Sequence, residues 1–400
     1  MFGLGRPYWI ILTPLVALVG LLALDRALPP PLPAPGAVSA VVRDHEGQVL
    51  RAFPVEGGRW RLPADLDTLD PDFVTALLAY EDERFFRHWG VDLPALVRAS
   101  RDSLMAGRIV SGGSTITMQL ARLIEPRDRT FGAKLIQMAR ALQLELRLSK
   151  PEILELYLTL APYGGNLEGV RAASWAYFGR EPNDLTIDQI AMLIALPQSP
   201  EARRPDRRPE NAVRARSRVL DRLASVGLAR VSAAAEAAAD PAPGRGAFPS
   251  DAWHVADSLR RARPDQRDHV STIDRRLQLM LQDSLAAEVS QTDEAVQFAA
   301  LIIETGSRSV RALAGSASPS RPRGGIDPTY RPRSLGSTLK PFIYVTASAH
   351  GVSAPQTQPA YLPPRSYSYK AANFPRRIGR AVSIAEAVRQ SCNLPAHTTH

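Results

Sequence analysis

The spacing of apolar residues divides this chain into an anchor, a spacer and two modules. The first apolar run, Tyr8–Leu24, is almost unbroken. At 1.5 Å of rise per residue it has about the minimum length for a bilayer span. No small-x-small cleavage pattern follows it, so residues 1–25 are predicted to hold a short cytoplasmic tail and an uncleaved transmembrane helix.

Residues 26–60 are predicted to be a spacer that ends in short strands. Five prolines between positions 29 and 35 stiffen the start of this segment. Two apolar pairs, Val41-Val42 and Val49-Leu50, then flank a polar turn at 44–47, which is the pattern of an antiparallel strand pair.

Residues 61–227 are predicted to form an all-α domain. From Asp70 to about Leu223 the apolar positions recur with the helical period. Three helix starts carry capping residues, two of them as capping boxes: Asp70 before Pro71, Ser149 with Glu152, and Thr186 with Gln189.

The rest of the chain is predicted to be a linker and a second module. Residues 228–265 are rich in alanine, proline and glycine, which favours a linker. Residues 266–400 form the second module, which opens at Thr272–Gln278. Its first hairpin is predicted from Leu301–Glu304, a Gly-Ser turn, and Val310–Gly315.

Composition limits the class of protein. Of the 400 residues, 45% are apolar and 22% are charged, so the chain can bury a core and is not globally disordered. The net charge of +9 has no basic stripe interleaved with aromatics, and we expect no nucleic-acid partner. The single cysteine, Cys392, forms no internal disulfide. Seven scattered histidines show no metal-ligand spacing, so no metal site is predicted.

The first candidate for chemistry is Glu81–Gly90. If the helix before it continues, Glu81, Phe85 and His88 fall on one face, with Asp82 beside them. A carboxylate held there against apolar neighbours suits a general base. Taken alone, the decapeptide is equally compatible with a solvated helix end that carries a satisfied histidine.

The second candidate is Ser111–Arg122. Two glycines followed by Ser114 and Thr115 predict a tight loop that runs into a capped helix. Free amides at such a start, beside hydroxyl groups, can seat a phosphate. Standing alone, the segment is compatible with an ordinary capped helix.

A third candidate lies in the second module. Ser337 and Lys340 form a Ser-x-x-Lys tetrad, in which one helical turn brings the lysine beside the serine hydroxyl. Ser391-Cys392-Asn393 follows and supplies a Ser-x-Asn motif that can relay protons and hold a substrate amide. The third element of such sites, Lys-Thr-Gly, is absent from the sequence.

Together these motifs resemble the family 51 peptidoglycan glycosyltransferases of the class A penicillin-binding proteins. The third family motif, Arg-Lys-x-x-Glu, is similar to Ala133–Gln137, where Lys134 is kept and Gln137 replaces the glutamate. Its surroundings resemble the 1C-type branch, which also has Gln. Glu152–Leu158 with Tyr163–Gly165 matches the fourth motif, and Ala172–Gly179 and Ala195–Pro200 continue the resemblance.

The resemblance implies a multi-domain fold. It consists of the transmembrane helix, an all-α lysozyme-like glycosyltransferase domain with a lipid-dipping jaw, and an incomplete α/β serine transpeptidase domain similar to β-lactamases. The expected partners are lipid-linked disaccharide-peptide (lipid II), the growing glycan strand and the bacterial inner membrane, with both domains on the periplasmic side. β-Lactams are expected to bind only if the transpeptidase module is complete. No cofactor is required, although it stays open whether a divalent cation such as Mg²⁺ binds at the pyrophosphate.

The resemblance also implies roles for individual residues. Glu81 would be the general base, and Lys134 would stabilise the departing pyrophosphate. Ser337 would be the acylated nucleophile of the transpeptidase, with Lys340, Ser391 and Asn393 around it. The expected substrate-binding residues are Asp82, Phe85, His88, Ser114, Thr115, Gln119, Arg122, Gln137 and Arg140.

Two rival interpretations stay open. The lack of Lys-Thr-Gly indicates a fragment or a truncated product, and a non-catalytic membrane scaffold that recruits wall enzymes is compatible with such a module. A lytic, lysozyme-like muramidase needs one catalytic acid and no pyrophosphate site, so Lys134 and Arg122 count against it.

Overall fold

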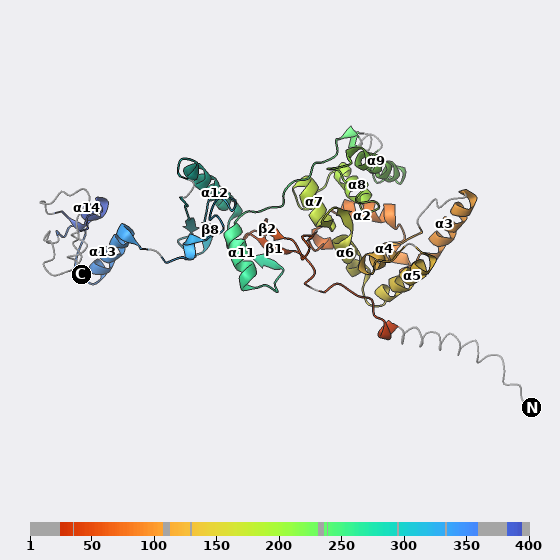
Figure 1. The fold of residues 1–400 in the computed structure, drawn as a ribbon, viewed down its shortest axis with the longest axis horizontal. Coiled ribbons are helices and arrows are strands. Elements are labelled where there is room, and N and C mark those ends of the chain that lie inside the picture. Colours follow the sequence, from red (N-terminus) through yellow and green to blue (C-terminus); the bar gives the residue numbers. More distant parts are fainter. Residues whose placement is uncertain are drawn as a thin grey trace, which may run out of the picture. The chain divides into compact units, whose positions relative to one another are not determined.

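The computed structural model describes residues 25–34, 36–106, 113–128, 130–230, 236–237, 239–293, 296–332, 334–358 and 382–393. The chain divides into two compact units, one ending at Thr329 and the other beginning at Tyr330 (Figure 1). The predicted anchor at Tyr8–Leu24 lies outside the described residues. Within the described ranges, no helix has the length and apolar character that a bilayer crossing requires.

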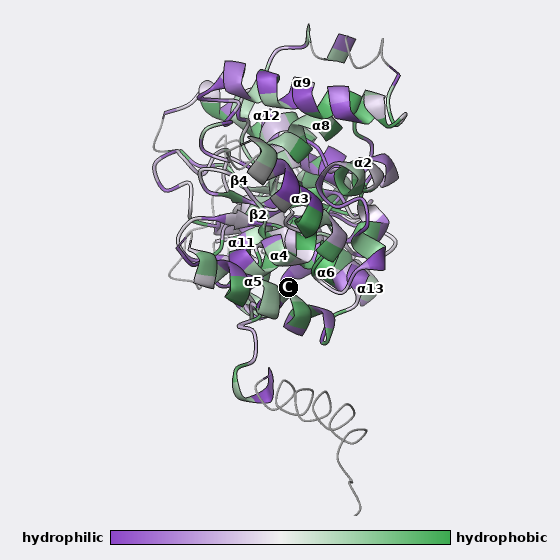
Figure 2. Cartoon of the chain, turned by 90° about the vertical axis from the view of Figure 1, so that its right-hand side faces the viewer, coloured by the Kyte–Doolittle hydropathy of each residue, from purple (hydrophilic) through white to green (hydrophobic). Residues whose placement is uncertain are grey.

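The first unit is mainly helical. Its buried side chains form one large core across the helices, with Phe73, Leu120, Ile153 and Leu193 fully inaccessible. Helix α9 shows both hydrophilic and hydrophobic residues along its length (Figure 2). The helices of the predicted all-α region are α2 Pro71–Glu81, α3 Leu93–Ala106, α4 Ile116–Ile124, α5 Phe131–Glu145, α6 Lys150–Leu160, α7 Val170–Phe178, α8 Ile187–Ala195 and α9 Pro209–Ser225, with the short 3₁₀ helices η1 Leu66–Thr68 and η2 Phe85–Arg87.

The capping residues start the helices where the sequence predicted. Asp70 precedes α2, and its carboxylate accepts from the backbone amides of Asp72 and Phe73. Ser149 and Thr186 head α6 and α8, each in a capping box with the residue three positions on. These local signals therefore fix three helix N-termini.

Helix α2 ends at Glu81, so the expectation that it continues and places Glu81, Phe85 and His88 on one face is wrong. Asp82 is extended, with φ −161°, and the chain then turns through η2. The reason is tertiary, because the Asp82 carboxylate turns away to accept a bond from the backbone amide of Ile116 at 2.9 Å. Phe85 is buried in the main core while Glu81 stays at the helix end.

The predicted strand pair forms and gains a third partner. Strand β1 Ala40–Arg43 pairs antiparallel with β2 Val49–Phe53, as expected. It also pairs parallel with β6 Asp268–Val270, which gives the order β2-β1-β6. A second small sheet has the order β3-β5-β4, formed by Trp60–Arg61, Leu167–Glu168 and Pro162–Gly164.

Helix α11 Trp253–Ala262 lies within the stretch predicted to be a linker, yet this helix and the region after it pack with the N-terminal strands. Helix α11 shares a core with β1 and β2, and α12 Arg275–Ser290 covers the predicted hairpin β7 Ala300–Ile303 and β8 Val310–Ala314. The sequence predicted a module boundary at residue 266, whereas the first compact unit of the structure extends to Thr329.

The second unit is small in its described part. After η3 Pro328–Tyr330, which spans the division, it holds η4 Gly336–Leu339, α13 Lys340–Ala349 and α14 Ile384–Arg389. Tyr344, Ile384, Ala387 and Cys392 form its own buried cluster.

Candidate active site

Glu81 lies at the end of α2, and both of its carboxylate oxygens are held by glutamine amides. Gln119 on α4 donates to Oε2 at 2.9 Å, and Gln198 after α8 donates to Oε1 at 2.7 Å. The carboxylate faces a cavity of about 310 Å³. The other lining residues are Ala79, Tyr80, Asp82, Glu83, Arg84, Asp92, Ala95, Arg98, Gly113, Ser114, Thr115 and Arg222.

A buried tyrosine supports the first of these amides. The Tyr157 hydroxyl on α6 donates to Gln119 Oε1 at 3.4 Å. Burial raises the pKa of Tyr157 well above its usual range, and the negative charge of Glu81 adds to this shift. Tyr157 therefore stays a neutral O–H donor at any physiological pH, and the Gln119 amide keeps its N–H₂ end toward Glu81.

Asp82 and His88 form a buried pair beside Glu81. His88 Nε2 lies 3.0 Å and 3.1 Å from the two Asp82 oxygens, and both side chains are less than 5% exposed. The same carboxylate accepts from the first amide of α4. Asp82 and His88 therefore fix the start of α4 against the end of α2. Phe85 supports them from the core, its ring centroid 6.2 Å from that of His88.

The start of α4 agrees with the prediction from Ser114 and Thr115. Thr115 is the N-cap, and its hydroxyl accepts from the amide of Met118 at 3.1 Å and donates to the carbonyl of Gly90 at 2.5 Å. Ser114 Oγ accepts from Lys134 Nζ on α5 at 2.6 Å. Residues 111 and 112 of the predicted loop lie outside the described ranges.

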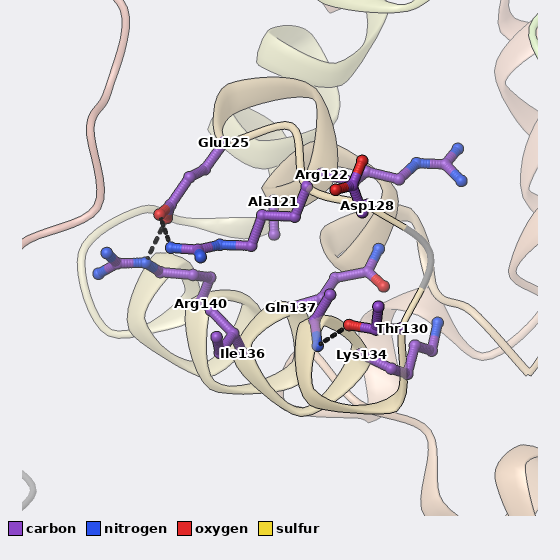
Figure 3. Close-up of a pocket in the computed structure, with 11 residues that line it drawn as sticks. Ala121, Arg122, Glu125, Asp128, Thr130, Lys134, Ile136, Gln137 and Arg140 are labelled. Carbon is purple, nitrogen blue, oxygen red and sulfur yellow. Dashed lines mark hydrogen bonds and ion pairs between the residues drawn. The ribbon is translucent and has the colours of Figure 1, made fainter.

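A basic pocket of about 240 Å³ separates α4 from α5 (Figure 3). It is lined by Arg122, Lys134, Gln137 and Arg140, among others. Burial lowers the pKa of Lys134, and the charge of Arg122 lowers it further. Lys134 is therefore a half-buried cation close to a second cation, an arrangement that favours an anionic ligand beside them.

Gln137 and Arg140 are already engaged by protein groups. The Gln137 amide donates to the carbonyl of Met118. Arg140 donates to Glu125 at 2.7 Å and to the carbonyl of Leu28 at 2.6 Å. Glu125 pairs with Arg140, as a dashed line in Figure 3 shows, and it also pairs with Arg127. Arg140 therefore braces the pocket wall in this structure.

The second unit brings together part of the predicted serine site. Lys340 Nζ donates to Ser391 Oγ at 3.1 Å and also to the Ser391 carbonyl. Burial lowers the pKa of Lys340. Ser337 lies on η4, just before Lys340, and Asn393 follows Ser391. The backbone amide of Lys340 donates to the carbonyl of Ser337, but within the described ranges no side-chain hydrogen bond joins Ser337 to Lys340 or Ser391.

Comparison with known proteins indicates the family. The transglycosylase family model matches residues 46–224, which include Glu81 and the basic pocket. Penicillin-binding protein 1C of Escherichia coli K12 is 36% identical over 98% of this chain and 51% of its own length. The chain belongs to the class A penicillin-binding proteins. It spans about half the length of that relative.

Other class A penicillin-binding proteins match a shorter region. Penicillin-binding protein 1A of Aquifex aeolicus is 38% identical over 44% of this chain and 24% of its own. A crystal structure of penicillin-binding protein 1A from Haemophilus influenzae aligns with 92% of this chain and 62% of that one, at 15% identity and a TM-score of 0.35. That likeness is too distant for a comparison of residue positions.

Sequence reasoning missed three polar residues that surround Glu81 in this class A penicillin-binding protein. Tyr157, Gln198 and Arg203 reach the site from α6 and from the segment after α8. Gln198 lies within the Ala195–Pro200 stretch that had carried part of the resemblance, which was the only signal for it.

Proposed function

We propose that the chain is a peptidoglycan glycosyltransferase that polymerises lipid II into β-1,4-linked glycan strands. The observation that carries the proposal is an amide-held carboxylate, Glu81, at the end of α2, in a cavity that is also lined by Ser114, the residue at the start of α4 that Lys134 contacts. This arrangement supplies a base and an anion site on either side of one helix terminus.

Glu81 takes the proton from the 4-hydroxyl of the acceptor sugar. The resulting oxygen attacks the anomeric carbon of the donor with inversion, and the bond to the undecaprenyl pyrophosphate breaks. Lys134 and Arg122 stabilise the negative charge of the leaving group, assisted by the α4 helix start at Thr115. Ser114 orients the Lys134 ammonium through its hydroxyl.

The lytic and scaffold alternatives receive less support. A muramidase needs no cationic pocket, yet Arg122, Lys134 and Arg140 converge on one. A scaffold needs no buried donor network behind a carboxylate, yet Tyr157 and Gln119 form one behind Glu81. Polymer formed from lipid II by the purified chain tests the proposal, since a muramidase shortens glycan strands and a scaffold leaves lipid II unchanged.

The pocket residues fit a pyrophosphate held directly by cations better than one held through Mg²⁺. Glu125, a carboxylate of this pocket, already pairs with Arg127 and Arg140. In the described part of the chain, no cluster of three or more His, Cys, Asp or Glu side chains is arranged to hold a metal ion.

We further propose that the domain works at the outer face of the bacterial inner membrane. Exposed apolar side chains recur along α5 at Phe131, Leu135 and Leu142, and Leu146 follows at its C-cap. The segment just after the predicted anchor is tied to the same helix, since Arg140 donates to the carbonyl of Leu28, and Arg147, two residues beyond the helix, pairs with Asp25. Residues 25–28 and this apolar face therefore lie at one end of the domain, which suits a lipid-linked donor.

Gln137 is expected to be tolerated at the position where the family motif has Glu. Its amide donates to the Met118 carbonyl, so it holds α5 against α4 in a neutral form. Gln137→Glu would place an unprotonated oxygen against that carbonyl and should slow polymerisation. The parental chain should turn over and be blocked by moenomycin, the phosphoglycolipid that mimics the donor in this family. A parental chain that neither polymerises lipid II nor binds moenomycin would favour the scaffold.

A second candidate function, serine transpeptidation, is favoured by the Lys340–Ser391 contact. The Lys-Thr-Gly element is missing from this sequence, so no edge strand supplies the cation for a stem-peptide carboxylate. We therefore expect no appreciable labelling of Ser337 by fluorescent penicillin in the 400-residue chain. A longer chain that carries the missing strand should label there, and Ser337→Ala should abolish that labelling. Strong Ser337-dependent labelling of the chain as given would contradict this expectation.

A further inference from the structure

The Glu81 carboxylate accepts a second hydrogen bond, from a residue that was not among the predicted site residues. Gln198 belongs to the segment after α8 and is 117 residues away from Glu81 in sequence. Its amide nitrogen lies 2.7 Å from Glu81 Oε1, while Gln119 occupies Oε2 at 2.9 Å. The two amides approach the carboxylate from different elements, so together they fix its rotation as well as its position.

The orientation of the Gln198 amide is set by Arg203. Arg203 Nη1 donates to Gln198 Oε1 at 3.0 Å and to the carbonyl of Ala195, at the end of α8, at 2.6 Å. A guanidinium has donors and no acceptor, so the oxygen of the Gln198 amide must face Arg203. The N–H₂ end of Gln198 is then left to face Glu81.

We propose that Gln198 and Arg203 are positioning residues for Glu81, with Arg203 acting through the Gln198 amide. The inference rests on the proposed glycosyltransferase function. Two neutral amides hold the ionised carboxylate by hydrogen bonds and leave its remaining lone pairs open to the acceptor hydroxyl. A direct Arg203–Glu81 pair would instead place a full positive charge on the base and weaken its attraction for a proton.

The second amide that binds Glu81, that of Gln119, is oriented in the same way. Tyr157 orients Gln119 as Arg203 orients Gln198, so each amide has one donor behind it. Gln198 is exposed and Gln119 is half-buried. Gln198 can therefore be substituted with little effect on the packing of the core, which makes it suitable for a kinetic test.

The test uses the full chain with lipid II as substrate and measures kcat, KM and the melting temperature. Gln198→Ala and Gln198→Met, of which the second keeps the side-chain length, should each lower kcat by about 10-fold, the effect of removing one hydrogen bond to a charged group. The KM for lipid II should stay unchanged. Gln189→Ala is the matched control, because Gln189 only caps α8.

A double-mutant cycle separates positioning from a structural role of Arg203. Arg203→Met should lower kcat in the parental background and have no further effect beside Gln198→Ala, since Arg203 acts through that amide. Arg203→Lys keeps a donor and should recover most of the kcat. An equal effect of Arg203→Met in both backgrounds, or normal kcat in both Gln198 variants of an active parent, would overturn the inference. A parental chain that forms no polymer would instead refute the proposed function, and the inference with it.

Discussion

Glu81→Gln should abolish polymerisation of lipid II while the protein stays folded. The substitution keeps the shape of the side chain and removes only its ability to take a proton. General bases contribute about 10²-fold to 10⁴-fold to the rate, so residual polymer should fall to the limit of detection. Glu81 is partly exposed, one of its two amide partners can still donate to the single oxygen of the new amide, and the exposed Gln198 can turn toward solvent. The melting temperature should therefore stay within about 2 °C of the parental value.

The matched control for this variant is Glu210→Gln. Glu210 lies at the start of α9, its side chain is 85% exposed, and its nearest cation is Arg214 at 3.7 Å. Glu210→Gln removes the same charge as Glu81→Gln, at a residue that lines neither cavity. Polymerisation by Glu81→Gln at the parental rate would exclude a catalytic role for Glu81, whatever the control shows.

Asp82→Ala should have its main effect on stability. The carboxylate accepts bonds from His88 and from the Ile116 amide, and the pair is almost fully buried. Its removal leaves two buried donors without an acceptor, so the free energy of unfolding should fall by about 3 kcal/mol. For a unit of this size the melting temperature should drop by about 5 °C. Thermal unfolding followed by circular dichroism measures the change.

The neighbouring carboxylate provides the control for stability. Glu83→Ala removes a side chain that is 77% exposed and only 3.9 Å from Arg222, so its free energy of unfolding should change by less than about 0.5 kcal/mol. If Asp82→Ala melted like the parent and yet lost as much activity as Glu81→Gln, then Asp82 would act in the chemistry and not as a structural acceptor.

The sequence predicted those parts of the fold that depend on local bonding. Ser149 and Thr186 begin helices because their side chains cap amides three residues away. The same reasoning failed at Asp82, where a contact with Ile116, 34 residues on, ends the helix that the apolar pattern would have extended. The period of apolar residues indicates which face of a helix can be buried. Where this helix ends depends instead on a hydrogen bond to a backbone amide that is distant in sequence.

The site shows the same division between local and distant signals. Glu81, Lys134 and the start of α4 lie in recognisable motifs, and the structure places Lys134 against Ser114. Arg203 lies outside every motif singled out from the sequence, yet it donates to Gln198 and to the end of α8. Its role depends on a fold that brings residues 81 and 198 together, and no short stretch of sequence carries that information.

The parallel pairing of β1 with β6 has a consequence for biosynthesis. The ion pair between Arg43 and Asp268 joins residues 225 positions apart, with all of helices α2 to α9 between them. During synthesis β1 and β2 must wait for β6 until the entire helical region has left the ribosome, because long-range parallel pairing cannot begin sooner. An expression fragment cut after residue 227 would leave the β1 edge open to other chains, so fragments for study should extend beyond Val270.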